Sequence, residues 1–187
     1  MIVVTTCCVN SGLFSILALV MDLARNKGYE DESVAITLIM LTFVSSVAGR
    51  MFVGGVNLIP RMHSVLLLTG CGVMASVALI TVAMATEFYT LVIGLVMVGS
   101  AMGGCTTIYA KCILDTSTVT LESYPLALGI ANTSEGVFDA LVPVLVATAV
   151  DTHGTYLYAF SILSGLCVST AVVLSLTFVC VVLRKTG

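Results

Sequence analysis

The strongest constraint on the fold of this chain is a series of six uncharged or nearly uncharged stretches that fill almost all of its 187 residues. Each stretch is about as long as the roughly 20 apolar residues that a helix needs to cross the hydrocarbon core of a bilayer. Only 9% of the residues are charged, whereas a soluble domain carries about 25%. We therefore predict an all-α integral membrane protein, a single six-helix transmembrane bundle over residues 1–187 that lies in a lipid bilayer.

The positions at which charged residues stop and start define the expected spans. The predicted spans are residues 1–21, 33–56, 64–86, 88–110, 125–150 and 156–183. Glu87 alone separates the third span from the fourth, which predicts a tight helical hairpin. The longest polar linker lies between Lys111 and Pro125, and proline is tolerated in the first turn of the helix that follows.

The distribution of basic residues predicts the orientation of the bundle. Six crossings place both termini on one side of the membrane. That side carries Arg61, Lys111, Arg184 and Lys185, and the other side carries Arg25 and Lys27. Because cytoplasmic loops are enriched in lysine and arginine, we expect a multi-pass protein of the plasma membrane with both termini in the cytoplasm.

Several function classes are disfavoured by what the chain contains. Its seven cysteines lie within spans or at a span end, without CxxC spacing or paired histidines, so neither a disulfide framework nor a zinc site is expected. No nucleophile or HExxH-type motif predicts an enzyme, a cofactor or a metal. The loops are too short for the re-entrant filter of a channel, and the small negative charge gives no nucleic-acid surface.

Small residues recur along the fourth span. Gly99 and Gly103 form a small-xxx-small pattern, which lets two helix backbones approach closely. We expect this pattern to serve packing within the bundle rather than dimerisation.

Three charged residues lie inside predicted spans and are the candidates for chemistry: Arg50, Glu135 and Asp139. Such residues are costly in a bilayer and usually face protein or a water-filled cavity. Glu135 and Asp139 are four residues apart and share one helical face, and Arg50 and Glu135 are each ten residues from a proline at the same end. We expect Arg50 to bind an anionic substrate group, with Glu135 or Asp139 as its counter-ion or as a protonatable relay. The alternative is a static charge pair that only locks two helices together.

Several motifs resemble the major facilitator superfamily, especially its monocarboxylate transporter-like branch. The run Val47–Gly55, which contains Gly49-Arg50, is similar to the eighth helix of that branch. Leu128–Gly136, Pro143 and the sequence Asp151-Thr-His-Gly-Thr-Tyr156 are similar to its eleventh helix and the loop into its twelfth.

The resemblance implies that the chain corresponds to the C-terminal six-helix half of a twelve-helix transporter, which works by alternating access. It also implies that Arg50 engages the carboxylate of a small organic anion, carried by symport with a coupled proton. The family usually has an aspartate where this chain has Ser46, and neutral residues where it has Glu135 and Asp139. These two acids are therefore candidates to supply the missing acidic function.

The resemblance further implies a partner, either the N-terminal six-helix half or another bundle, and we expect the chain to be a fragment of a longer transporter. A natural half-length transporter and an inactive truncated copy are the other interpretations of its length. The rival function is a non-transporting scaffold or receptor, in which the charges inside the spans are structural.

Overall fold

The chain forms six long α-helices in the computed structural model, which describes residues 2–29, 31–59, 63–115 and 119–186. The helices are α1 (Ile2–Asn26), α2 (Glu32–Val56), α3 (Ser64–Met84), α4 (Phe88–Leu114), α5 (Tyr124–His153) and α6 (Tyr156–Thr186). All six are long and apolar enough to cross a membrane, and the described residues contain no strand. The predicted six-helix membrane architecture is confirmed. Arg61 lies outside the described residues, as do the side chains of Cys180, Arg184 and Lys185.

The helix bounds differ from the predicted spans mainly at two ends. α1 continues five residues past the predicted end at residue 21, and α4 reaches Leu114 rather than residue 110. Charged residues mark where the apolar segment stops, but they do not interrupt backbone hydrogen bonding, so a helix can continue into the polar interface. α5 carries Pro125 in its first turn and ends at His153. The capping residue Gly154 follows, and its φ of 70° is the left-handed conformation that favours glycine.

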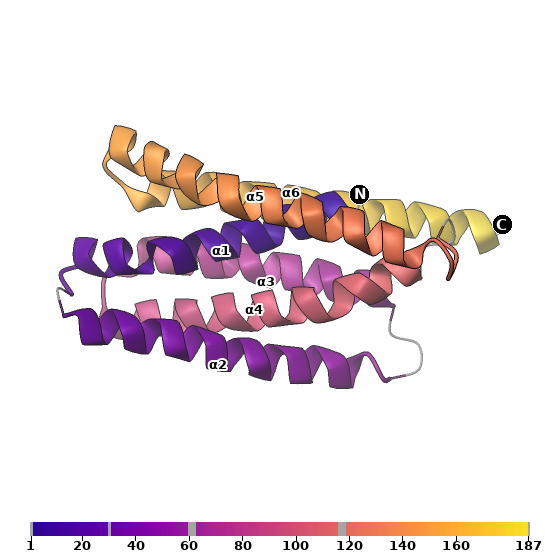
Figure 1. The fold of residues 1–187 in the computed structure, drawn as a ribbon, viewed down its shortest axis with the longest axis horizontal. Coiled ribbons are helices and arrows are strands. Elements are labelled where there is room, and N and C mark those ends of the chain that lie inside the picture. The colour runs from indigo at the N-terminus through magenta and orange to yellow at the C-terminus, as the bar shows by residue number, and fades with distance from the viewer. Residues whose placement is uncertain (1, 30, 60–62, 116–118, 187) are drawn as a thin grey trace.

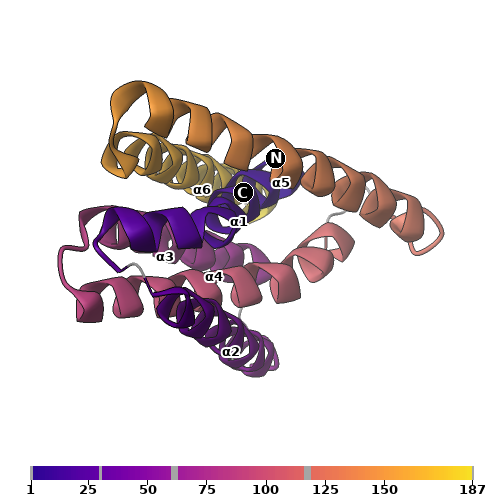
Figure 2. The same cartoon turned by 60° about the vertical axis from the view of Figure 1, so that its left-hand side comes forward.

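The helices pack with α4 along both α2 and α3, α3 also along α6, and α1 along α5 (Figures 1 and 2). Large apolar side chains from several helices fill the core, among them Leu13, Leu79, Leu95 and Phe160. α5 lies at the periphery and is held mainly by α1, and these two helices run in the same direction (Figure 1).

The seam between α2 and α4 is built from small residues. A side chain at Gly49 would overlap the backbone of Ser100, and one at Gly103 would overlap the backbone of Ser46. A side chain at Gly99 would likewise overlap Thr42 and Ser45. The small-xxx-small pattern therefore brings two backbones together inside the bundle, which confirms the predicted internal packing.

Lysine side chains form hydrogen bonds between helices at both ends of the bundle, outside the apolar segments. Lys27 Nζ donates to the backbone oxygen of Ala83 at 3.2 Å and to that of Ala85, so a cation caps the C-terminal end of α3. Burial lowers the pKa of this amine. At the opposite end of the bundle, Lys111 Nζ donates to Asn57 Oδ1 at 2.8 Å and ties α4 to the end of α2.

Candidate functional site

The two intramembrane acids face the interior of the bundle. Glu135 and Asp139 are both half-buried, and they lie on the side of α5 that packs against α1. Their common side agrees with the four-residue spacing. Glu135 accepts a hydrogen bond from Asn10 Nδ2, and Asn10 is only 3% exposed.

Asp139 lies against a second polar residue of α1. The Ser11 hydroxyl is beside the Asp139 carboxyl, but makes no hydrogen bond of normal geometry with it. Within the described part of the chain, Asp139 Oδ1, Ser11 Oγ and Asn10 Oδ1 are buried and without hydrogen-bond partners. Cys7, one turn earlier on α1, is close enough to feel the charge of both acids.

A further hydrogen bond links α5 to α4 next to these acids. Tyr109 donates its hydroxyl proton to Asn132 Oδ1, and Asn132 lies one turn before Glu135. Tyr109 is also near enough to the Glu135 carboxylate to feel its charge. The acids therefore belong to a polar contact region formed by α1, α4 and α5, which we call the acidic contact: Asn10, Ser11, Tyr109, Asn132, Glu135 and Asp139.

Arg50 lies elsewhere. The residue before it, Gly49, packs on α4. One residue further along a helix is a rotation of about 100°, and the Arg50 side chain is exposed. Among the described residues the ion pairs consist of Arg25 with Glu32 alone. The structure thus does not pair Arg50 with Glu135 or Asp139, and the static charge pair between these residues is not formed.

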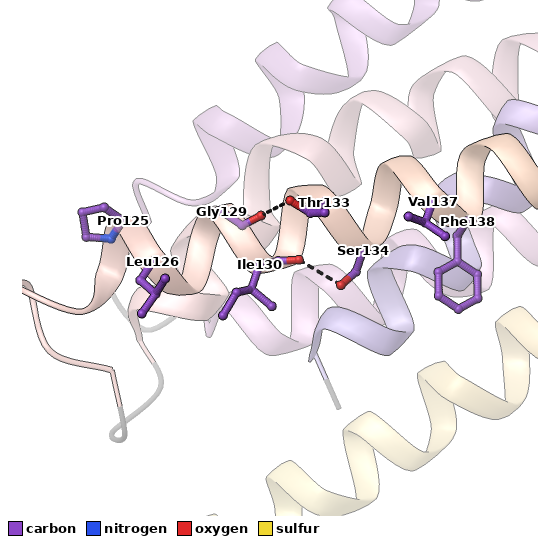
Figure 3. A pocket seen from close by; sticks show the side chains of 8 residues that line it. All are labelled: Pro125, Leu126, Gly129, Ile130, Thr133, Ser134, Val137 and Phe138. Atoms are coloured by element: carbon purple, nitrogen blue, oxygen red, sulfur yellow. Dashed lines mark hydrogen bonds between the residues drawn. The ribbon is translucent and has the colours of Figure 1, made fainter.

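One groove runs along the opposite face of α5. It has a volume of about 580 Å³ and is lined by α5 side chains from Pro125 to Phe138 (Figure 3). The hydroxyls of Thr133 and Ser134 are satisfied within the helix, by the backbone oxygens of Gly129 and Ile130, each at 2.9 Å. The groove therefore presents an apolar surface, and neither acid lines it.

A second hollow of about 430 Å³ lies where α2, α3 and α4 meet. Its lining includes Phe52, Leu66 and Met74, and Arg50 does not belong to it. No charged side chain lines either space, so they resemble contact surfaces more than polar substrate sites. In the described parts of the chain, no three His, Cys, Asp or Glu side chains are grouped to hold a metal ion.

Sequence reasoning found the charged members of the acidic contact and missed the neutral ones. Asn10 could have been found from the sequence, because an amide in an otherwise apolar span needs a hydrogen-bond partner, as a charged group does. Asn132 has the same property and lies three residues before Glu135. Ser11 and Tyr109 gave no such signal, since both residues are common in membrane helices.

The fold and this contact define the chain as an all-helical, multi-pass membrane protein with acids inside its membrane-spanning region. No model of a known protein family matches the sequence, and no curated protein matches it.

Proposed function

We propose that the chain is a secondary-active transporter, or the C-terminal half of one, which moves a small organic anion such as a monocarboxylate by alternating access. The observation that carries the proposal is Arg50. It is an intramembrane cation that is exposed at the bundle surface and that forms no ion pair within the described residues.

The energetic argument concerns where such an arginine can lie. Lipid exposure at the centre of a helix costs about 2.5–3.5 kcal/mol on insertion scales. A water-filled cavity that contains an anion removes much of this cost, because a guanidinium binds a carboxylate through two parallel hydrogen bonds. The motifs around Arg50 that resemble the transporter family support the same role.

The cavity requires a second wall. α2 and α5 expose large apolar side chains that the bundle leaves uncovered, including Phe43, Met51, Leu141 and Leu145. We propose that part of this surface faces an N-terminal six-helix half or a partner bundle, with the remainder facing lipid. The protein is then in the plasma membrane with both termini in the cytoplasm, in keeping with its basic residues.

The test is uptake of radiolabelled monocarboxylates, with lactate, pyruvate and an aromatic carboxylate as probes, by membranes that contain the native protein. Arg50→Gln should lower uptake by about 10- to 100-fold, because a hydrogen bond to a charged group contributes roughly 1.5–3 kcal/mol. Arg50→Lys should retain part of the uptake, and Arg25→Gln, at an exposed ion pair, should leave it unchanged. Normal uptake by an Arg50→Gln protein that reaches the membrane would exclude the substrate role.

A non-transporting scaffold or receptor is the second candidate, and the acidic contact favours it. Glu135 and Asn132 are hydrogen-bonded to neighbouring helices, as structural residues would be. This candidate predicts no flux of any probe. The size of the native protein shows whether the second six-helix half belongs to the same chain or to a separate partner. A twelve-helix chain would be about twice the 19.5 kDa of this one.

A further inference from the structure

We propose that Asn10, Ser11, Glu135 and Asp139 form a binding site for a small monovalent metal cation of the sodium type, between α1 and α5. The site deepens the proposed function, since it names a coupling ion for the transporter. It can be measured without any organic anion, so failure of the cation site and failure of anion transport are separate results.

The first argument is charge. Glu135 and Asp139 lie one turn apart and close enough to repel each other. The described basic side chains are engaged or placed elsewhere: Arg25 at Glu32, Lys27 at the end of α3, Lys111 at Asn57, and Arg50 exposed without an ion pair. Two carboxylates inside a membrane require compensation, and a bound cation supplies it.

The second argument is the set of buried oxygens. Asn10 and Ser11 are 3% and 0% exposed, and Asn10 Oδ1, Ser11 Oγ and Asp139 Oδ1 have no hydrogen-bond partners among the described residues. Buried polar atoms are normally paired, so each such orphan requires an explanation. The three oxygens, one of them on the Ser11 hydroxyl that also carries a proton, lie next to two acids. Such oxygen-rich surroundings are those that a hard cation prefers.

The orientation of Asn10 supports the same assignment. Its Nδ2 donates to Glu135, which leaves Oδ1 available as a ligand beside the carboxylate. Ser11, the next residue, lies beside Asp139. Two adjacent residues of α1 thus meet two acids on consecutive turns of α5, and all four side chains carry oxygen.

A sodium-type ion fits this set better than the other cations that acids bind. A single bound proton joins two oxygens, and the Ser11 hydroxyl can donate one hydrogen bond more, whereas a cation contacts several oxygens at once. Calcium takes 6–8 oxygen ligands, and magnesium keeps several of its waters. One Glu135 oxygen already accepts a hydrogen bond from Asn10, so the four side chains leave five oxygens, fewer than calcium takes.

A cation at this position also has a mechanical consequence. α5 is held to the bundle mainly by α1, and the site lies in that contact. Binding therefore stabilises the state in which α1 and α5 are packed, and an ion that prefers one state shifts the population toward it.

The test is thermal unfolding of the purified chain in lipid nanodiscs, in sodium, lithium, potassium, calcium or choline chloride at constant ionic strength. A ligand that binds only the folded state raises the melting temperature with its concentration. We expect a saturable rise in sodium and little or none in choline, together with saturable binding of radioactive sodium.

The variants are chosen to separate ligand loss from unfolding. Asp139→Asn removes the negative charge and one of two oxygens, and Ser11→Ala removes the hydroxyl oxygen, both with little change in volume. Each substitution should raise the half-saturating sodium concentration by roughly tenfold or more. Loss of a residue that only supports a metal ligand already lowers metal affinity by about that factor. Asp151→Asn, at an exposed acid near the end of α5, is the matched control and should leave it unchanged. If Asp139→Asn fails to fold, the half-saturating sodium concentration of Ser11→Ala tests the site on its own.

Three results would overturn the site. The first is an equal rise in all salts, which is an ionic-strength effect. The second is a rise in calcium alone, which indicates a divalent site. The third is stabilisation by acid pH without any effect of sodium, which means that the carboxyls bind protons; the other titratable groups facing them are Cys7 and Tyr109.

Discussion

At the scale of single residues, the charges inside the membrane could be located from the sequence, but their partners could not. Glu135 stands out in an apolar span, yet the group that it contacts is 125 positions away in the chain. Nothing local in either segment encodes this pairing, because it depends on how α5 rotates and lies against α1. Asn10 is the residue that a search for intramembrane polar groups can add.

The bond between Asn10 and Glu135 gives a prediction about stability. Asn10→Leu leaves the half-buried Glu135 carboxyl without its donor, which should cost about 1–3 kcal/mol of unfolding free energy. Asn10→Leu combined with Glu135→Leu should recover most of this loss, because an apolar pair leaves no orphan group. Unfolding titrations of the two single variants and the double variant measure the coupling. Strictly additive losses would show that the two residues do not interact.

At the scale of helices, hydropathy predicts the membrane spans closely, but it does not predict which helices pack against each other. The pairs α2–α4 and α1–α5 join segments that are not consecutive. The glycines of α4 predict a close approach to some helix, but the complementary small residues of α2 are equally consistent with lipid or with another chain. Apolar periodicity is weak here because lipid and protein interior are both apolar, so the pattern that identifies a buried face in soluble proteins is largely absent.

The α2–α4 seam predicts opposite effects for two similar substitutions. Gly103→Ala would drive a methyl group into the backbone of Ser46, and should destabilise the protein by about 1–3 kcal/mol, as overpacking does. Gly70→Ala, on α3, has nothing within 4 Å of the new atom and should stabilise by about 0.5–1 kcal/mol through helix propensity. Equal effects of the two changes in thermal unfolding would argue against the seam.

At the scale of the whole molecule, the described charged residues gather at the two ends of the bundle, with the intramembrane trio as the exception. This distribution suits a chain that spans a bilayer six times, and the class of protein could be predicted from it. A substrate could not, because the two hollows are apolar and Arg50 forms no ion pair with either acid.

The proposed orientation predicts which loops are reachable from outside the cell. In a background with the native cysteines replaced by serine or alanine, Asp151→Cys should react with a membrane-impermeant maleimide in intact cells. Asp115→Cys, at the opposite end of the bundle, should react only after permeabilisation. Gel-shift assays read both results, and the reverse pattern would place the termini outside.

The long separation between Asn10 and Glu135 has a consequence for biosynthesis. α1 is made before α5 and must enter the bilayer with an amide whose partner has not yet been synthesised. At about 5–20 residues per second, the intervening 125 positions take roughly 6–25 s. During that interval Asn10 needs water, lipid headgroups or an insertion factor as a temporary partner. α5 therefore completes the polar contact of α1, and synthesis interrupted between these two helices should leave Asn10 without its partner and α1 recognisable to quality control.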